Sequence, residues 1–113
     1  MEEKFEVVYL EDARQFLLNL DVKTRLKLLY NIDKAKGLND PKLFKKLNNE
    51  IWEFRTVYNN LQYRLLAFWD KSAKTFVVST HGFVKKTDKV PEKEIERAEK
   101  LRQKYFEQKG GKK

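Results

Sequence analysis

Residues 51–69 read IWEFRTVYNNLQYRLLAFW, and this stretch decides the centre of the fold. Two runs rich in aromatic and β-branched residues, which favour strands, flank the pair Asn59-Asn60. Asparagine tolerates the positive φ angles that a tight hairpin turn requires. The stretch therefore predicts a β-hairpin whose turn is centred on Asn59-Asn60.

This turn determines which side chains face each other across the hairpin. A two-residue turn places Arg55 directly opposite Arg64, and like charges in that position destabilise a sheet. Glu53 lies two residues before Arg55 on the same face, where it supports the pair by partial neutralisation. We expect both guanidinium groups on a solvent-reachable face, available for function. The alternative is that the arginines only solvate an open face, with Glu53 as their partner.

A third strand follows and ends in HGFVKKT, residues 81–87. In an antiparallel meander, the end of this strand lies beside the start of the preceding strand, where Arg64 is found. Lys85 and Lys86 would then approach the arginine pair, and four cations on one concave patch favour phosphate binding. His81 is the single histidine of the chain, and it is either a possible acid or base or a hydrogen-bonded structural residue.

The flanking segments complete an α+β domain with a mostly antiparallel sheet. They predict a short strand at 5–9, a helical hairpin with an N-cap at Asp21, and a closing helix that begins near Pro91. Residues 43–47 are expected to form one further helical turn. The predicted order is therefore β-α-α-β-β-β-α.

The second helix of the predicted hairpin carries an apolar stripe of Val22, Leu26 and Leu29. Residues 1–109 are predicted to form a single domain, because 113 residues favour one domain. Residues 110–113 are predicted to be a flexible basic tail.

Composition limits the chemistry and the partners. The chain has no cysteine, which excludes disulfides and Cys nucleophiles, and its one histidine excludes a multi-His metal site. We therefore predict neither a metal nor a cofactor. The net charge is +8, concentrated at 21–47 and 84–113, and this charge favours polyanionic partners. With no apolar run that resembles a signal or a membrane span, the sequence predicts a cytoplasmic protein without membrane partners.

The ordered motifs resemble one known family. These motifs are IWEFR at 51–55, YRL at 63–65, HGFVKKT at 81–87 with Pro91 following, and EIERA at 94–98. Together they resemble the HigB branch of the RelE/ParE toxin superfamily, from about Leu47 to Ala98. The N-terminal half is similar only in layout, with a strand and a helical hairpin.

The resemblance implies the toxin of a type II toxin–antitoxin pair, with a RelE/ParE-like domain. It implies a ribosome-dependent mRNA interferase, which is a metal-independent endoribonuclease that inhibits translation. In that chemistry the ribose 2′-hydroxyl attacks the adjacent phosphate and leaves a cyclic phosphate. Arg55, Arg64, Lys85 and Lys86 would be the catalytic residues, and Lys85 or Lys86 could also act as the general base.

The implied partners are the ribosome, mRNA and a helix-turn-helix, HigA-like antitoxin. We expect the free toxin to be monomeric and the antitoxin to cover or distort the basic groove, because an acidic segment could neutralise the net charge of +8. Two other readings of the sequence stay open. One is a ParE-like toxin that poisons gyrase by protein binding, and the other is a non-enzymatic basic protein that binds nucleic acid.

Overall fold

The sheet is built around the hairpin that the sequence predicts. In the computed structural model, which describes residues 4–72 and 75–111, Asn59 and Asn60 adopt φ angles of 50° and 65°. Arg55 pairs with Arg64 across the hairpin, so the predicted register is confirmed. The elements in chain order are β1 (Glu6–Tyr9), α1 (Glu11–Leu18), α2 (Val22–Gly37), β2 (Phe44–Lys46), β3 (Trp52–Tyr58), β4 (Leu61–Asp70), β5 (Phe76–Lys85) and α3 (Glu92–Gly111).

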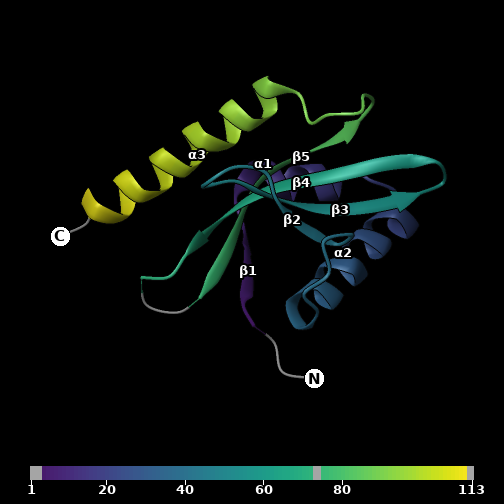
Figure 1. The fold of residues 1–113 in the computed structure, drawn as a ribbon, viewed down its shortest axis with the longest axis horizontal. Coiled ribbons are helices and arrows are strands. Elements are labelled where there is room, and N and C mark those ends of the chain that lie inside the picture. The colour runs from purple at the N-terminus through teal and green to yellow at the C-terminus, as the bar shows by residue number, and fades with distance from the viewer. Residues whose placement is uncertain (1–3, 73–74, 112–113) are drawn as a thin grey trace.

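The strands form one sheet in the order β1-β5-β4-β3-β2. Only the β1–β5 pairing is parallel, so the prediction of a mostly antiparallel α+β fold is confirmed. Helices cover both faces, and Figure 1 shows α2 and α3 on opposite sides of the sheet. No helix within the described ranges is long and apolar enough to cross a membrane.

Each face of the sheet has its own hydrophobic core. The first core joins α1 and α2 to the face that carries Phe54, Tyr63 and Leu65. The second core joins Ala98 of α3 to Leu66 and to the rest of the opposite face. Because alternate residues of a strand point to opposite faces, Arg55 and Arg64 share the face on which α3 packs.

β2 differs from the sequence prediction, which expected a helical turn at 43–47. Phe44 pairs with Phe54 across the β2–β3 ladder, and their ring centroids are 4.4 Å apart. The Phe44 ring also stacks on Trp52, with centroids 4.9 Å apart. These aromatic contacts between strands favour the extended conformation over a helical turn.

Of the apolar stripe expected on α2, Leu29 packs against the first core and the other two residues do not. Val22 and Leu26 are exposed, and the buried side chains of this helix are Thr24, Leu28, Ile32 and Ala35. The predicted N-cap is present, because the Asp21 carboxylate accepts a hydrogen bond from the Thr24 backbone N–H at 3.3 Å. α2 therefore begins at the predicted residue, but most of the face that packs against the core is not the predicted one.

A bulge in β5 sets the direction of the side chains at its end. Leu66 pairs with His81 and Ala67 pairs with Ser79, so Thr80 is the extra residue. The extra residue brings His81 onto the same face of the sheet as Val78, although the two are three positions apart. Phe83 and Lys85 follow on that face.

The C-terminal half of α3 is anchored at Asp70, the last residue of β4. Tyr105 Oη and Lys109 Nζ both donate to Asp70 Oδ2 at 2.7 Å. Burial would raise the pKa of the Asp70 carboxyl, but these hydrogen bonds, together with two from Ser72, hold it well below its usual range. α3 continues to Gly111, so the tail expected at 110–113 is helical at its first two positions, and 112–113 lie outside the described residues.

Candidate active site

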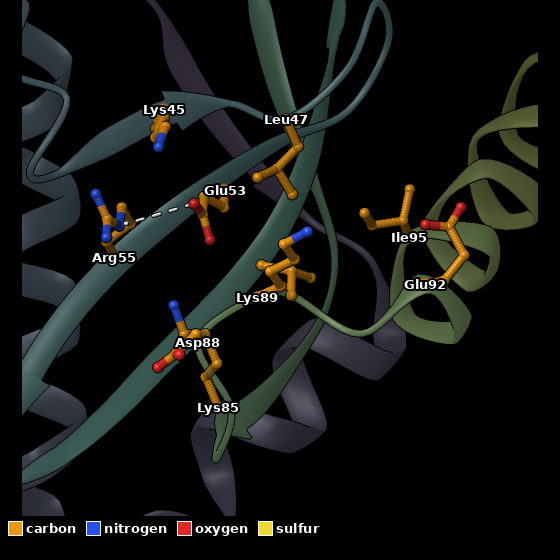
Figure 2. A pocket seen from close by; sticks show the side chains of 10 residues that line it. Lys45, Leu47, Glu53, Arg55, Lys85, Asp88, Lys89, Glu92 and Ile95 are labelled. Atoms are coloured by element: carbon orange, nitrogen blue, oxygen red, sulfur yellow. Dashed lines mark ion pairs between the residues drawn. The ribbon is translucent and has the colours of Figure 1, made fainter.

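A pocket of about 360 Å³ opens beside Arg55, between the sheet and the segment that leads into α3. Figure 2 shows Glu53 and Arg55 on β3, with Lys85 approaching from the end of β5. The lining residues come from β2 and the residue after it, from β3, β5, the 88–90 segment and α3, and they are Lys45, Leu47, Glu53, Arg55, Lys85, Asp88, Lys89, Val90, Glu92 and Ile95. The structure therefore brings Arg55 and Lys85 together, as the sequence predicts.

Two lysines in this lining were missed by the sequence analysis. Lys45 lies on β2 and pairs with Glu53 across the ladder. It was missed because β2 was expected to be helical, which hides the alternation that places Lys45 on the pocket face. Lys89 lies in the segment between β5 and α3, and its position there has no periodic signal in the sequence.

Arg64 lies behind the pocket rather than on a solvent-reachable face, so that part of the prediction is wrong. It is only 1% exposed, and Glu53 is 4% exposed. Arg64 Nε lies 3.0 Å from Glu53 Oε1, although the N–H does not point along that line and neither atom has a hydrogen-bond partner among the described residues. The other guanidinium nitrogens donate to the Tyr63 carbonyl at 3.0 Å and to Gln62 Oε1 at 2.9 Å. Arg64 is buried because these partners replace water around its charge.

Arg55 borders a second, smaller pocket as well. That pocket has a volume of about 290 Å³, and it is lined by Lys42, Arg55, Val57, Gln62 and Arg64. The Arg55 side chain is about 29% exposed, and its Nη1 donates to the Pro41 carbonyl at 3.2 Å. Its Nε lies 3.7 Å from Glu53 Oε2. The Glu53 carboxylate thus lies within ion-pair distance of both arginines, and Arg55 is the more exposed of the two.

The electrostatics of the site depress the pKa of two of its cations. Burial lowers the pKa of Lys85, and the neighbouring charges of Arg64 and Arg55 lower it further. Burial also lowers the pKa of Arg64, against the opposing effect of Glu53. An anion bound in the pocket would therefore favour the protonated form of the Lys85 amine.

Lys86 does not join the cluster. It is exposed directly after β5, and it lines neither of the two pockets described above. β5 ends at Lys85, so Lys86 lies beyond the strand pairing that positions its neighbour at the pocket. The four-cation patch of the sequence prediction is thus reduced to Arg55 and Lys85 in the lining, with Arg64 behind them.

His81 has a structural environment away from the pocket lining. It is 1% exposed, its Nε2 lies 3.0 Å from Glu94 Oε1, and its Nδ1 lies 3.0 Å from Thr80 Oγ1. A carboxylate can only accept, so Nε2–H donates to Glu94. The Thr80 hydroxyl has a single proton, and two acceptors lie within reach of it, the Leu66 carbonyl at 3.3 Å and Nδ1 at 3.0 Å. Burial lowers the pKa of His81, against the opposing effect of Glu94. The histidine joins β5 to the first turn of α3.

Within the residues that the structure describes, no group of three or more His, Asp or Glu side chains is arranged to hold a metal ion.

Residues 15–103, which include β2 to β5 and every residue that lines the pocket, match the family described as phage-derived protein Gp49-like (DUF891). The chain belongs to the Gp49-like family. The Gp49-like family is a toxin family of toxin–antitoxin systems, of the RelE and HigB type. The narrower HigB assignment stays a prediction. No curated protein matches the chain.

Proposed function

We propose that this Gp49-like protein is the toxin of a type II toxin–antitoxin pair of the HigB branch, and that it cleaves mRNA on the ribosome without a metal. The observation that carries the proposal is the position of Arg55 and Lys85 in one pocket, in front of the buried pair of Arg64 and Glu53. Two cations that line one pocket, in front of a buried ion pair, suit a phosphodiester that gains negative charge during the reaction.

In the proposed reaction, the ribose 2′-oxygen forms a bond to the adjacent phosphorus while the bond from phosphorus to the 5′-oxygen breaks. The products are a 2′,3′-cyclic phosphate and a 5′-hydroxyl, so no water is consumed in this step. Arg55 and Lys85 contact the non-bridging oxygens and stabilise their developing charge. Arg64 acts as a positioning residue, because it holds Glu53, which in turn lies beside Arg55.

Lys85 could in principle carry the charge or, when neutral, remove the proton of the 2′-hydroxyl. We assign it the charged role, because a bound phosphate favours the protonated amine and offsets the depression of its pKa by burial and by the arginines. The proton of the 2′-hydroxyl then passes to a water molecule in the open pocket, and the leaving 5′-oxygen takes up a proton from water, so the step is balanced without a net change in water.

The test is single-turnover cleavage of a defined mRNA on programmed ribosomes, with mapping of the new 5′ ends. Lys85→Ala should slow cleavage by about 10²- to 10³-fold, as expected when one preorganised donor is removed. Lys86→Ala is the matched control, because it removes the same charge at the neighbouring position outside the pocket lining, and it should retain nearly the wild-type rate. Equal rates for the two variants would overturn the assignment of the pocket.

The purified chain can also be tested for the two alternative functions. A gyrase poison would leave the mRNA intact and would trap cleaved DNA when gyrase and supercoiled plasmid are added. A non-enzymatic nucleic-acid binder would retard labelled RNA in a salt-dependent way without producing new ends. Either result would replace the nuclease proposal.

A further inference from the structure

α2 carries a second apolar face that points away from the molecule. Val22, Leu26 and Tyr30 are 60%, 58% and 58% exposed. They follow one another at intervals of four residues, which places them one above the other along the helix. The core uses a different face of α2, formed by Leu28, Ile32 and Ala35 among others. Scattered exposed apolar residues are common, but an aligned stripe on one helix marks an interaction surface.

Basic side chains border this stripe on both sides. At about 100° per residue, Lys23, Lys27 and Lys34 fall along one border, whereas Arg25 and Lys36 fall along the other. Asp33, the only acidic residue of α2, falls at the same angle as the stripe itself, and its carboxylate is paired with Lys36 at 3.2 Å, so its charge is offset within the helix.

The lysines of the first border lie close to the stripe itself. The Nζ atoms of Lys27 and Lys34 lie 5.6 Å and 5.4 Å from the centre of the Tyr30 ring. A partner that covers the stripe must therefore place its own charges near these two ammonium groups.

We propose that the outward face of α2 docks an amphipathic helix of the antitoxin, whose apolar ridge covers the stripe and whose acidic flanks meet the basic borders. The identity of the partner rests on the proposed function, whereas the surface rests on α2 alone. A helix laid on a helix of similar length buries an apolar seam of this kind. The basic borders select against a second copy of the chain, because a symmetric contact would set equal positive borders against each other.

The proposed docking face and the pocket lie on opposite sides of the sheet. α2 packs on one face of the sheet, whereas the pocket opens on the other. Docking on α2 therefore leaves the lining of the pocket uncovered, and neutralisation requires a further segment of the antitoxin or a change in the toxin. Affinity for the antitoxin and catalytic competence should accordingly be separable by substitution.

The experiment measures binding between the purified chain and the protein encoded by the neighbouring gene, by titration calorimetry at low and high salt. Leu26→Glu places a carboxylate in the middle of the stripe without touching the core, and it should weaken binding by about tenfold or more. Leu61→Glu is the matched control, because Leu61 is also an exposed leucine, 46% exposed, but lies at the hairpin turn. The control should bind like the wild type.

The charge borders are tested with Lys27→Glu combined with Lys34→Glu. This double variant should bind more weakly and should lose most of the salt dependence of the wild type. Lys104→Glu combined with Lys100→Glu on α3 makes the same change of net charge at another site and should have a smaller effect.

The failures of the two proposals are distinguishable. If Leu26→Glu binds the antitoxin as tightly as the wild type, the α2 surface is wrong even where mRNA cleavage is normal. If binding depends on α2 but no mRNA is cleaved, the nuclease proposal fails and the docking surface stands. A wild-type chain that binds neither neighbouring gene product would overturn the surface. Dimerisation through α2, or binding to vesicles of anionic and zwitterionic phospholipid that Leu26→Glu abolishes, would also overturn it.

Discussion

Arg64 and Glu53 form a buried ion pair in the centre of the sheet, with Arg64 Nε 3.0 Å from Glu53 Oε1. Removing one partner of such a pair leaves an uncompensated charge away from water. Arg64→Ala should therefore lower the free energy of unfolding by about 3–5 kcal/mol, measured by urea denaturation at neutral pH. Arg64→Met combined with Glu53→Gln removes both charges and should be less destabilising than Arg64→Ala. A single variant as stable as the wild type would show that the pair contributes nothing.

The lowered pKa of Lys85 predicts how cleavage depends on pH. If the charged amine stabilises the phosphate, the rate should fall as pH rises through this lowered pKa, because the fraction of protonated Lys85 decreases. Lys85→Arg keeps the charge at higher pH, so its activity should decline at a more alkaline pH than that of the wild type. The measurement is the single-turnover rate at subsaturating toxin, which reports the pKa of the free toxin, across the pH range that the ribosome tolerates. An inactive Lys85→Arg, together with a wild-type rate that increases with pH, would instead identify Lys85 as the base.

His81 predicts a loss of stability in mild acid. Its pKa is lower in the folded chain than in the unfolded chain, so the unfolded state binds the proton first as pH falls below about 6.5. The free energy of unfolding should therefore decrease between about pH 7 and pH 5. His81→Gln lacks this titration and should show a smaller decrease over the same interval, by denaturant titration at each pH. Asp70 titrates at lower pH in both proteins and does not distinguish them.

Gly82 lies beneath the Phe16 ring of α1, where there is no room for a side chain. A Cβ atom at this position would lie 2.6 Å from Cγ of the Phe16 ring. Gly82→Ala should therefore destabilise the fold by about 1–3 kcal/mol, because the ring sits over β5 and must shift. Phe16→Leu should recover part of this loss in the double variant, since the smaller side chain leaves room for the methyl group. Additive losses in a thermal melt would contradict a direct contact.

The parts of the fold that the sequence predicts are those with local causes. The register of Arg55 and Arg64 follows from two asparagines at the turn. The position of Lys85 follows from the antiparallel pairing of the next strand, whose end lies beside the start of β4. The burial of Arg64 could not be read in the same way, because it depends on the Glu53 carboxylate, which meets the guanidinium only after the two strands pair.

Two other differences have a non-local origin. β2 forms because the Phe44 ring stacks on the rings of Phe54 and Trp52. The apolar spacing within residues 43–47 does not indicate these contacts, because the partner rings lie on another strand. On α2, apolar residues occur on two faces, and periodicity alone does not show which face meets the sheet. The choice is made by the fit of Leu28 and Ile32 into the core, so Val22 and Leu26 remain outside.

The turn at Asn59 and Asn60 has a consequence for how this chain can vary through evolution. Since side chains alternate with a period of two, one residue inserted there or removed would move Arg64 into the aromatic core and Tyr63 toward the pocket. Glycine at either position would keep both φ angles and thus the register. Selection should therefore tolerate changes of residue type at this tip while it holds the number of residues constant, although the tip lies outside the linings of both pockets.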